Sequence, residues 1–328
     1  MRLLSGRVLA VYLFCCAVWG STWLVIKIGL TDLPPFHFAA IRMGVACLLM
    51  APFAFRPGIL RPSGAENALI LVCGTIQIGL AYAFIFLAET RIDSGLSAIL
   101  FCTFPIWMGV LGHFLLPNEP FTARNLVAAL LGLAGVAMIE APAIPAAMRT
   151  GPGSLLIGGA CVLGSSMAGA LANVLNKRWF AHVAPERNVW GQTLSGTLFL
   201  VLLAVGFERG AQLTWTPRSV FAVSYLAVLG TALAFAGLFW LIPRVPVSVI
   251  GTIPLTDTVI AIALGAVILG ERLSLRAILG TLLILFGVAL TVWRSPTPRR
   301  GGAALRPFSE IFRRGPALDN ENSRRSGR

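Results

Sequence analysis

Charged residues are scarce in this chain. Asp, Glu, Lys and Arg make up 12% of its 328 residues, while apolar residues make up 57%. Soluble globular proteins carry about 25% charged residues, so this composition excludes that class. The apolar residues occur in long continuous runs rather than in ten-residue alternations, which favours membrane-spanning α-helices over a β-barrel.

Motifs for catalysis and for metal or nucleotide binding are also missing. The six cysteines all lie inside apolar runs and form no CxxC pair, which gives no support to a metal site or a disulfide framework. The three histidines fall near different segment ends without an HExxH motif, and no GxxxxGK[ST] loop would hold ATP. We therefore expect no enzyme activity, no cofactor, no metal and no ATP drive within this chain.

Acidic residues are half as frequent as basic ones: 13 Asp and Glu stand against 26 Lys and Arg, for a net charge of +13. Much of the excess lies in residues 294–328, whose Arg, Pro, Gly and Ser content is typical of a disordered segment. This basic tail either anchors the topology while solvated or is attracted to anionic inner-leaflet lipid. Nucleic-acid binding is not expected, since the excess is the ordinary bias of an inner-membrane protein.

Apolar segments of membrane-spanning length are abundant. A helix needs about 20 predominantly apolar residues to cross a bilayer. The sequence predicts ten such helices, at residues 8–29, 36–55, 67–88, 94–116, 124–140, 154–176, 189–206, 219–241, 246–269 and 274–293. They form two sets of five. Because five is odd, the second set enters the membrane from the opposite side, as in inverted-repeat transporters, whose substrate site lies between the halves.

The ends of the two sets repeat in sequence. NEPFTARNLVAALLGLAGVAMI begins at Asn118, and GERLSLRAILGTLLILFGVALT begins at Gly270. A constant offset of 152 residues aligns Glu119 with Glu271 and also aligns an Arg and a Gly-Val-Ala run. We therefore divide the chain into a cytoplasmic N-terminus, a first repeat, a linker, a second repeat and the basic tail, at residues 1–7, 8–140, 141–153, 154–293 and 294–328.

Positive charge predicts the orientation. With the N-terminus in the cytoplasm, most of the 26 Lys and Arg residues fall on the cytoplasmic side, largely because of the basic tail. We therefore expect a multi-pass protein of the inner, or plasma, membrane with both termini in the cytoplasm. Arg2 and Arg7 precede the first apolar run, which continues to Leu30 without an A-x-A-like cleavage site, so it is interpreted as a retained helix.

The stretch from Trp19 to Arg42, WGSTWLVIKIGLTDLPPFHFAAIR, resembles the opening of EamA-type proteins of the drug/metabolite transporter superfamily. Glu119 and Glu271, each followed by a helix with a Gly-Val-Ala run, resemble the ends of that family's repeats. The resemblance covers about residues 8–293. It implies ten helices in two inverted five-helix repeats around a central cavity, and movement of small metabolites, often amino-acid efflux.

One position departs from the family pattern. In that pattern a proline precedes the repeat-end Glu by about four helical turns. Pro105 satisfies this in the first half, whereas Asp257 or its neighbour takes the matching place in the second half, with Pro254 one turn earlier.

Asp257 is the strongest single candidate for a functional residue, because it lies in the middle of an apolar span. A carboxylate there is costly and is by default a hypothesis of function. Asp257 either carries a proton or pairs with a substrate ammonium. The alternative is a structural carboxyl group bonded to Thr256, Thr258 or another helix.

Other residues within the spans are candidates for lining a cavity. Pro105 and Pro254 free backbone carbonyls and bend helices, which suits either gating or a fixed kink. Candidates for holding a substrate by amide hydrogen bonds or ring stacking are Trp19, Trp23, Gln77, Tyr82, Trp107 and Asn173. The alternatives are core or interfacial positions for the aromatic residues and helix–helix hydrogen bonds for the amides.

Two basic residues flank the first predicted outer turn. Lys27 lies near the end of the first span and Arg42 lies inside the second. They either form an outer-mouth charge that meets a carboxylate substrate, or they snorkel to the interface or pair with Glu89 or Asp93.

Together these features predict an all-α polytopic membrane protein that acts as a secondary transporter by alternating access. The expected substrate is a small organic metabolite, amino-acid-like by resemblance, and efflux is the expected direction. The expected partners of the protein are the lipid bilayer, the small-molecule substrate and, if transport is coupled, protons. The sequence leaves the oligomeric state open. The competing hypothesis is a non-transporting membrane sensor or scaffold that acts through its basic tail.

Overall fold

The computed structural model describes residues 6–59, 62–92, 94–117, 119–141, 152–268 and 274–293, and the elements in these ranges are all helices. Eight of the helices in these ranges are long and apolar enough to cross a membrane, and two further apolar helices, Ala123–Ile139 and Val247–Ile260, are shorter. Residues 1–5, most of the predicted linker, Glu271 and the basic tail lie outside the described residues.

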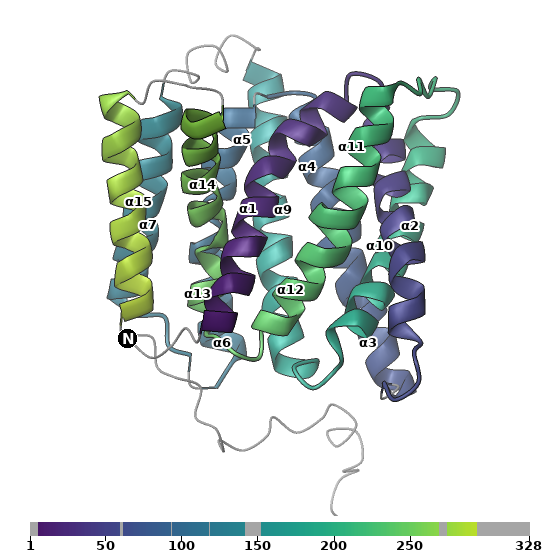
Figure 1. Ribbon diagram of the computed structural model, residues 1–328, viewed down its shortest axis with the longest axis horizontal. Coiled ribbons are helices and arrows are strands. Elements are labelled where there is room, and N and C mark those ends of the chain that lie inside the picture. Colours follow the sequence, from purple (N-terminus) through teal and green to yellow (C-terminus); the bar gives the residue numbers. More distant parts are fainter. Residues whose placement is uncertain are drawn as a thin grey trace, which may run out of the picture.

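The helices stand side by side as a bundle (Figure 1). In chain order they are α1 (Gly6–Gly29), α2 (Pro35–Ala54), α3 (Gly64–Gly74), η1 (Thr75–Leu80), α4 (Ala81–Glu89), α5 (Ser94–Phe101), α6 (Phe104–Leu115), α7 (Ala123–Glu140), α9 (Pro152–Trp179), α10 (Pro185–Phe207), α11 (Pro217–Ala227), η3 (Val228–Leu233), α12 (Ala234–Leu241), α13 (Val247–Gly251), α14 (Ile253–Ile268) and α15 (Leu275–Trp293). The two segments marked η are π-helical turns inside longer helices.

Each apolar segment that the sequence predicts is mainly helical where the structure describes it, and two of the segments contain a break. The largest difference in starting point is at α10, expected from residue 189 but beginning at Pro185. Proline is favoured at the first turn of a helix because its φ angle is already helical and its missing N–H is not needed there. The helix therefore begins before the apolar run does, as it also does at Pro217.

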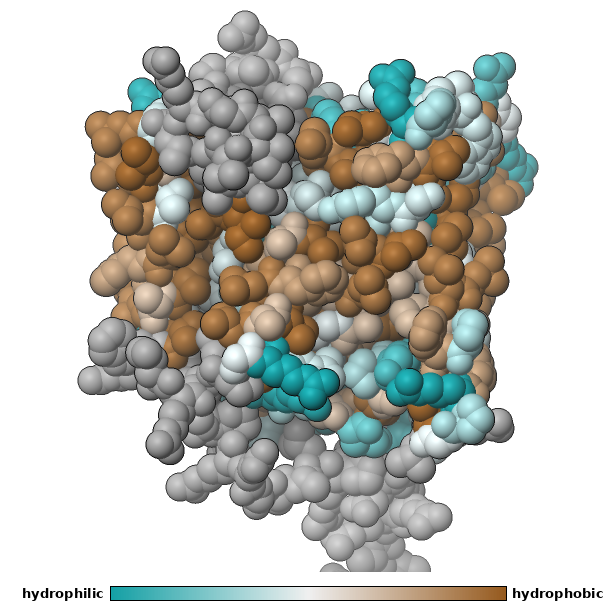
Figure 2. Space-filling model, in the orientation of Figure 1, coloured by the Kyte–Doolittle hydropathy of each residue, from teal (hydrophilic) through white to brown (hydrophobic). Residues whose placement is uncertain are grey.

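The outer surface of the bundle is apolar. On the face that Figure 2 shows, a brown belt of hydrophobic side chains crosses the middle, and hydrophilic residues gather toward the two ends. Leu48 and Leu202, for example, are 76% and 71% exposed. Water would penalise so much exposed apolar surface, whereas hydrocarbon does not, so the belt fits a multi-pass membrane protein.

The helices that carry Pro105 and Pro254 are broken rather than bent. α5 ends at Phe101 and α6 begins at Phe104, while α13 ends at Gly251 and α14 begins at Ile253. Each break lies just before a proline, which cannot donate the backbone hydrogen bond that would continue the helix. The breaks meet inside the bundle, where the Cys102 thiol donates to the Pro254 carbonyl over 3.7 Å.

π-helical turns occur at matching places in the two halves. η1 lies in the middle of the helix from Gly64 to Glu89, and η3 lies in the middle of the helix from Pro217 to Leu241. A π-helical turn widens the helix locally and alters which carbonyls are bonded, and it is frequent at functional sites.

Contacts between the halves are reciprocal. α7 packs along α15, where a Cβ added to Gly135 would lie 2.5 Å from the Gly280 carbonyl oxygen. Shifting both residues by the 152-residue offset gives Gly287 and Ala128, and a Cβ on Gly287 would lie 2.6 Å from the Ala128 carbonyl oxygen. Likewise α1 packs on α11, α12 and α14, while α9 packs on α4 and α6.

Candidate functional site

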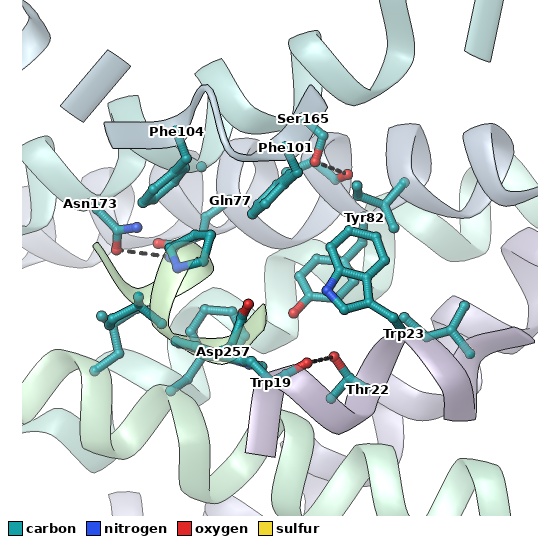
Figure 3. Close-up of a pocket in the computed structure, with 18 of the residues that line it drawn as sticks. Trp19, Thr22, Trp23, Gln77, Tyr82, Phe101, Phe104, Ser165, Asn173 and Asp257 are labelled. Carbon is teal, nitrogen blue, oxygen red and sulfur yellow. Dashed lines mark hydrogen bonds between the residues drawn. The ribbon is translucent and has the colours of Figure 1, made fainter. Parts of the chain in front are cut away.

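A cavity of about 140 Å³ lies in the middle of the bundle between the two halves. It is lined from α1, α2, η1, α4, α5 and α6 of the first half, and from α9, α12, α13 and α14 of the second half. The lining residues with aromatic, polar or charged side chains are Trp19, Thr22, Trp23, Arg42, Gln77, Tyr82, Phe101, Phe104, Ser165, Asn173, Phe235 and Asp257, several of which Figure 3 labels.

Aromatic rings form much of the wall. Trp19 meets Phe235 edge to face at a centroid distance of 5.6 Å, and Trp23 meets Phe101 in the same way at 5.7 Å. Phe101 in turn stacks on Phe104 at 5.7 Å. These ring pairs hold one another in place. This part of the wall is therefore a firm apolar surface.

An amide cluster lies at one part of the cavity. Gln77, from η1, donates to the Asn173 carbonyl oxygen over 3.1 Å and accepts from the Asn176 amide over 3.1 Å. Asn176 also accepts from Asn188 and Gln192 of α10, both over 2.8 Å. Gln77 and Asn173 thus join helices to one another and face the cavity as well (Figure 3).

Asp257 lies in the cavity wall with only 6% of its surface exposed. Thr258 Oγ1 lies 3.5 Å from its Oδ1. α1 reaches Asp257 through Gly20, the glycine of the WGS motif, because a Cβ added there would lie 2.6 Å from the Asp257 carbonyl oxygen. The motif therefore allows α1 to touch the backbone of α14 beside this carboxyl group.

Arg42 is also in the cavity wall, whereas the sequence placed it beside Lys27 at the outer turn. It is 1% exposed. Its Nε donates to Thr231 Oγ1 over 3.0 Å and its Nη2 donates to the Gly230 carbonyl over 3.3 Å, both in η3. Its guanidinium carbon lies 5.0 Å from the centre of the Tyr82 ring, a cation–π contact.

Three predicted residues do not line this cavity. Lys27 is half exposed and pairs with Glu89 at 3.8 Å, one of the alternatives that the sequence left open. Trp107 packs at the edge of the main hydrophobic core. Pro105 lies against α13, where a Cβ on Gly251 would be 3.1 Å from its Cα. Pro254 does line the cavity.

The phenylalanines of the wall were not singled out by the sequence. Phe101, Phe104 and Phe235 are ordinary apolar residues of apolar spans, so polarity gives no signal for them. The position of Phe101 and Phe104 does give a signal, because both lie within four residues of Pro105. A proline there was expected to free backbone carbonyls that line a cavity.

Glu119, the repeat-end Glu of the first half, ties three segments together at one end of the bundle. Its Oε1 lies 2.6 Å from Lys177 Nζ at the end of α9, and its Oε2 accepts the Val247 N–H, the first of α13, over 2.8 Å. A carboxylate at a helix N-terminus is favoured by the helix dipole. The family-like Glu thus holds the start of the broken helix that carries Asp257.

The model of the EamA-like transporter family matches residues 6–141 and again residues 156–293. The chain belongs to this family. The double match covers most of the chain and leaves out the basic tail. The chain is accordingly a membrane transporter of the EamA, or drug/metabolite transporter, type.

Several curated relatives have similar sequences along most of their length. The uncharacterized transporter YoaV of Bacillus subtilis is 27% identical over 278 residues, 84% of this chain and 93% of its own. The uncharacterized inner membrane transporter YedA of Escherichia coli is 26% identical over 292 residues, 88% and 90% of the two chains. A probable amino-acid metabolite efflux pump of Salmonella typhimurium is 26% identical over 291 residues, 86% and 93%.

A protein of known crystal structure has the same fold. It superposes with a TM-score of 0.74 at 19% sequence identity, covering 88% of this chain and 98% of the other.

Proposed function

We propose that this EamA-family transporter moves a small amino-acid-like metabolite out of the cell, across the inner membrane, by alternating access. The observation that carries the proposal is the central cavity, which combines an aromatic wall with Arg42, Asp257 and an amide cluster. Such a lining suits a solute that is apolar at one end and charged at the other. The similar proteins named as an inner membrane transporter and as a probable amino-acid metabolite efflux pump support it.

The proposed architecture is ten membrane crossings in two inverted five-helix repeats, with both termini in the cytoplasm. On this proposal the two shorter apolar helices, Ala123–Ile139 and Val247–Ile260, cross as well. The double family match, the π-helical turns at matching places and the reciprocal glycine contacts of α7 and α15 support it. Reporter fusions after residues 56 and 91, which follow an even and an odd number of spans, are expected to report opposite sides of the membrane.

The proposed coupling residue is Asp257. As a carboxyl group in the cavity wall, it either exchanges a proton during each cycle, giving proton antiport, or holds the substrate ammonium during passive exchange. Asp257 lies beside α1, where Cys16 is its electrostatic neighbour and Tyr12 hydrogen-bonds to the adjacent Thr256. Neither of these carries a charge of its own at neutral pH.

Transport into proteoliposomes distinguishes the two mechanisms. We would measure uptake of a labelled amino-acid panel with and without an imposed pH gradient, in the wild type and in Asp257→Asn. Proton coupling predicts uptake that the gradient accelerates in the wild type and no longer accelerates in Asp257→Asn. If Asp257→Asn keeps both the rate and the gradient dependence of the wild type, Asp257 has no part in coupling or binding.

A further inference from the structure

Arg42 carries a buried N–H that makes no hydrogen bond of regular geometry, and its interaction with the Tyr82 side chain brings it no negative charge. Its Nε and Nη2 are bonded to Thr231 and Gly230, but its Nη1 is buried and has no hydrogen-bond partner. Among the residues that the structure describes, no carboxylate lies within ion-pair distance of Arg42. A buried guanidinium group without a countercharge and with an unused N–H is unfavourable, so the arrangement calls for a bound anion.

The guanidinium group is fixed in place rather than free to turn away. Two bonds to η3 hold one of its edges, and the Tyr82 ring packs beside it with a centroid 5.0 Å from the guanidinium carbon. Arg42 and Tyr82 both line the central cavity. A planar guanidinium group is suited to a carboxylate, because its N–H groups match the carboxylate oxygens.

We propose that Arg42 binds the free carboxylate of the transported solute through Nη1, so that the substrate class is restricted to small carboxylates with an apolar side chain. This inference rests on the proposed transport function and names the substrate chemistry of the same cavity. Asp257, on the second half of the cavity wall, takes the cationic group of a zwitterionic substrate. The apolar side chain packs among Trp23, Phe101 and Phe104.

The proposal assigns different roles to the residues around Arg42. Arg42 contacts the substrate, whereas Thr231 is a positioning residue that acts through the guanidinium group. Replacing Thr231 by Val keeps the shape of the side chain and removes the oxygen that Nε bonds. It is therefore expected to weaken carboxylate binding less than loss of Arg42 does.

Three matched probes test the proposal on the purified full-length protein. L-phenylalanine carries both charged groups, 3-phenylpropionate carries only the carboxylate, and L-phenylalaninol carries only the ammonium. We would measure the affinity of each probe from ligand-induced thermal stabilisation. In the wild type, phenylalanine and 3-phenylpropionate are expected to bind. Phenylalaninol is expected to bind at least about tenfold more weakly than phenylalanine, because loss of one charge-assisted hydrogen bond weakens affinity by about this factor.

Variants then locate the effect. Arg42→Gln is expected to lose at least about tenfold in affinity for both carboxylates while its affinity for phenylalaninol stays unchanged. Arg209→Gln, at an exposed position, is the matched control and should bind all three probes as the wild type does. If Arg42→Gln does not fold, Thr231→Val decides the question: it is expected to weaken binding of both carboxylates and to leave binding of phenylalaninol unchanged, and equal binding of all three probes to Thr231→Val and the wild type would overturn the role of Arg42.

The outcomes separate this inference from the proposed function. Equal affinity of the wild type for phenylalanine and phenylalaninol, or an unchanged carboxylate preference in Arg42→Gln, overturns the role of Arg42. If the wild type transports amino alcohols or amines but binds no carboxylate, the inference fails and the transport function stands. If proteoliposomes take up no solute of either kind, the transport function fails as well.

Discussion

Gly20 illustrates how a single missing side chain shapes this site. It is the glycine of the WGS motif, and it lets α1 approach the backbone of α14 beside Asp257. Small residues allow such close helix contacts in membranes, where packing rather than the hydrophobic effect drives helix association. The sequence displays the motif, but only the structure shows which helix the glycine faces.

Gly20→Ala is therefore expected to destabilise the protein. The added Cβ would lie 2.6 Å from the Asp257 carbonyl oxygen, which is backbone and cannot turn aside. Overpacking of this kind costs about 1–3 kcal/mol of unfolding free energy, to be measured by denaturant unfolding in mixed micelles. Gly206→Ala is the control, because that glycine lies in α10 with nothing within 4 Å of the added atom. Equal stability of the two variants would contradict the close contact.

Polarity within an apolar span is a useful but incomplete guide to the cavity. It singles out Trp19, Trp23, Gln77, Tyr82, Asn173 and Asp257, which do line it. It also singles out Trp107, which packs elsewhere, because a sequence does not give the rotation of a helix about its axis. It cannot single out the wall phenylalanines, since an apolar residue facing a cavity looks like one facing lipid.

Among the elements, α13 depends on a side chain from outside its own helix. Glu119 accepts the first N–H of α13 and pairs with Lys177, which in turn donates to the Val245 carbonyl over 2.5 Å. Both charged side chains are largely buried, at 17% and 12% exposure. Removing one partner leaves the other charge poorly solvated.

Glu119→Gln is expected to lower the free energy of unfolding by about 1–3 kcal/mol, because Lys177 loses its countercharge. The control is Glu186→Gln, whose partner Arg56 is 58% exposed, so that loss of this pair costs about 0–1 kcal/mol. Denaturant unfolding of both variants alongside the wild type gives the comparison. A loss in Glu119→Gln no larger than that in Glu186→Gln would count against its role in holding α13.

The sequence predicts where the elements lie better than how they are interrupted. Apolar run length places the helices to within a few residues, because a helix in lipid must satisfy its own backbone. Pro105 and Pro254 mark the two breaks only approximately: the helix stops a few residues earlier, where the breaks contact each other at Cys102. The π-helical turns carry no sequence signal of comparable strength, because tertiary packing selects them.

On the scale of the whole molecule, two structural repeats should make matched contacts: a residue pair in contact should have a counterpart pair in contact after the 152-residue shift. Two units related by a two-fold axis contact each other in matched pairs. Gly135→Ala and Gly287→Ala would each place a Cβ against a backbone carbonyl oxygen of the opposite helix, at 2.5 and 2.6 Å. Both are expected to lose about 1–3 kcal/mol of unfolding free energy. A large loss in one variant and none in the other would contradict matched packing of α7 and α15.

Deletion of the basic tail distinguishes the transporter hypothesis from the scaffold hypothesis. A transporter that works through its central cavity should keep its uptake rate after deletion of residues 297–328, within about a factor of two, whereas a scaffold acting through the tail should lose its function. Uptake into proteoliposomes by the truncated and full-length chains checks this. Loss of uptake in a truncated protein that is still inserted and folded would favour a functional tail.

The central claim is that the cavity opens alternately to the two sides of the membrane. Its most direct test is Ser165→Cys, in a protein whose six native cysteines are replaced by alanine. Ser165 lines the cavity, whereas Ser224, exposed on the outer face of α11, provides the control Ser224→Cys. A charged maleimide would be added from one side of sealed vesicles or the other. Alternating access predicts that Cys at 165 reacts from both sides and is protected by a transported amino acid, while Cys at 224 reacts from neither. Reaction at 165 from one side only, unchanged by any transported solute, would contradict the account.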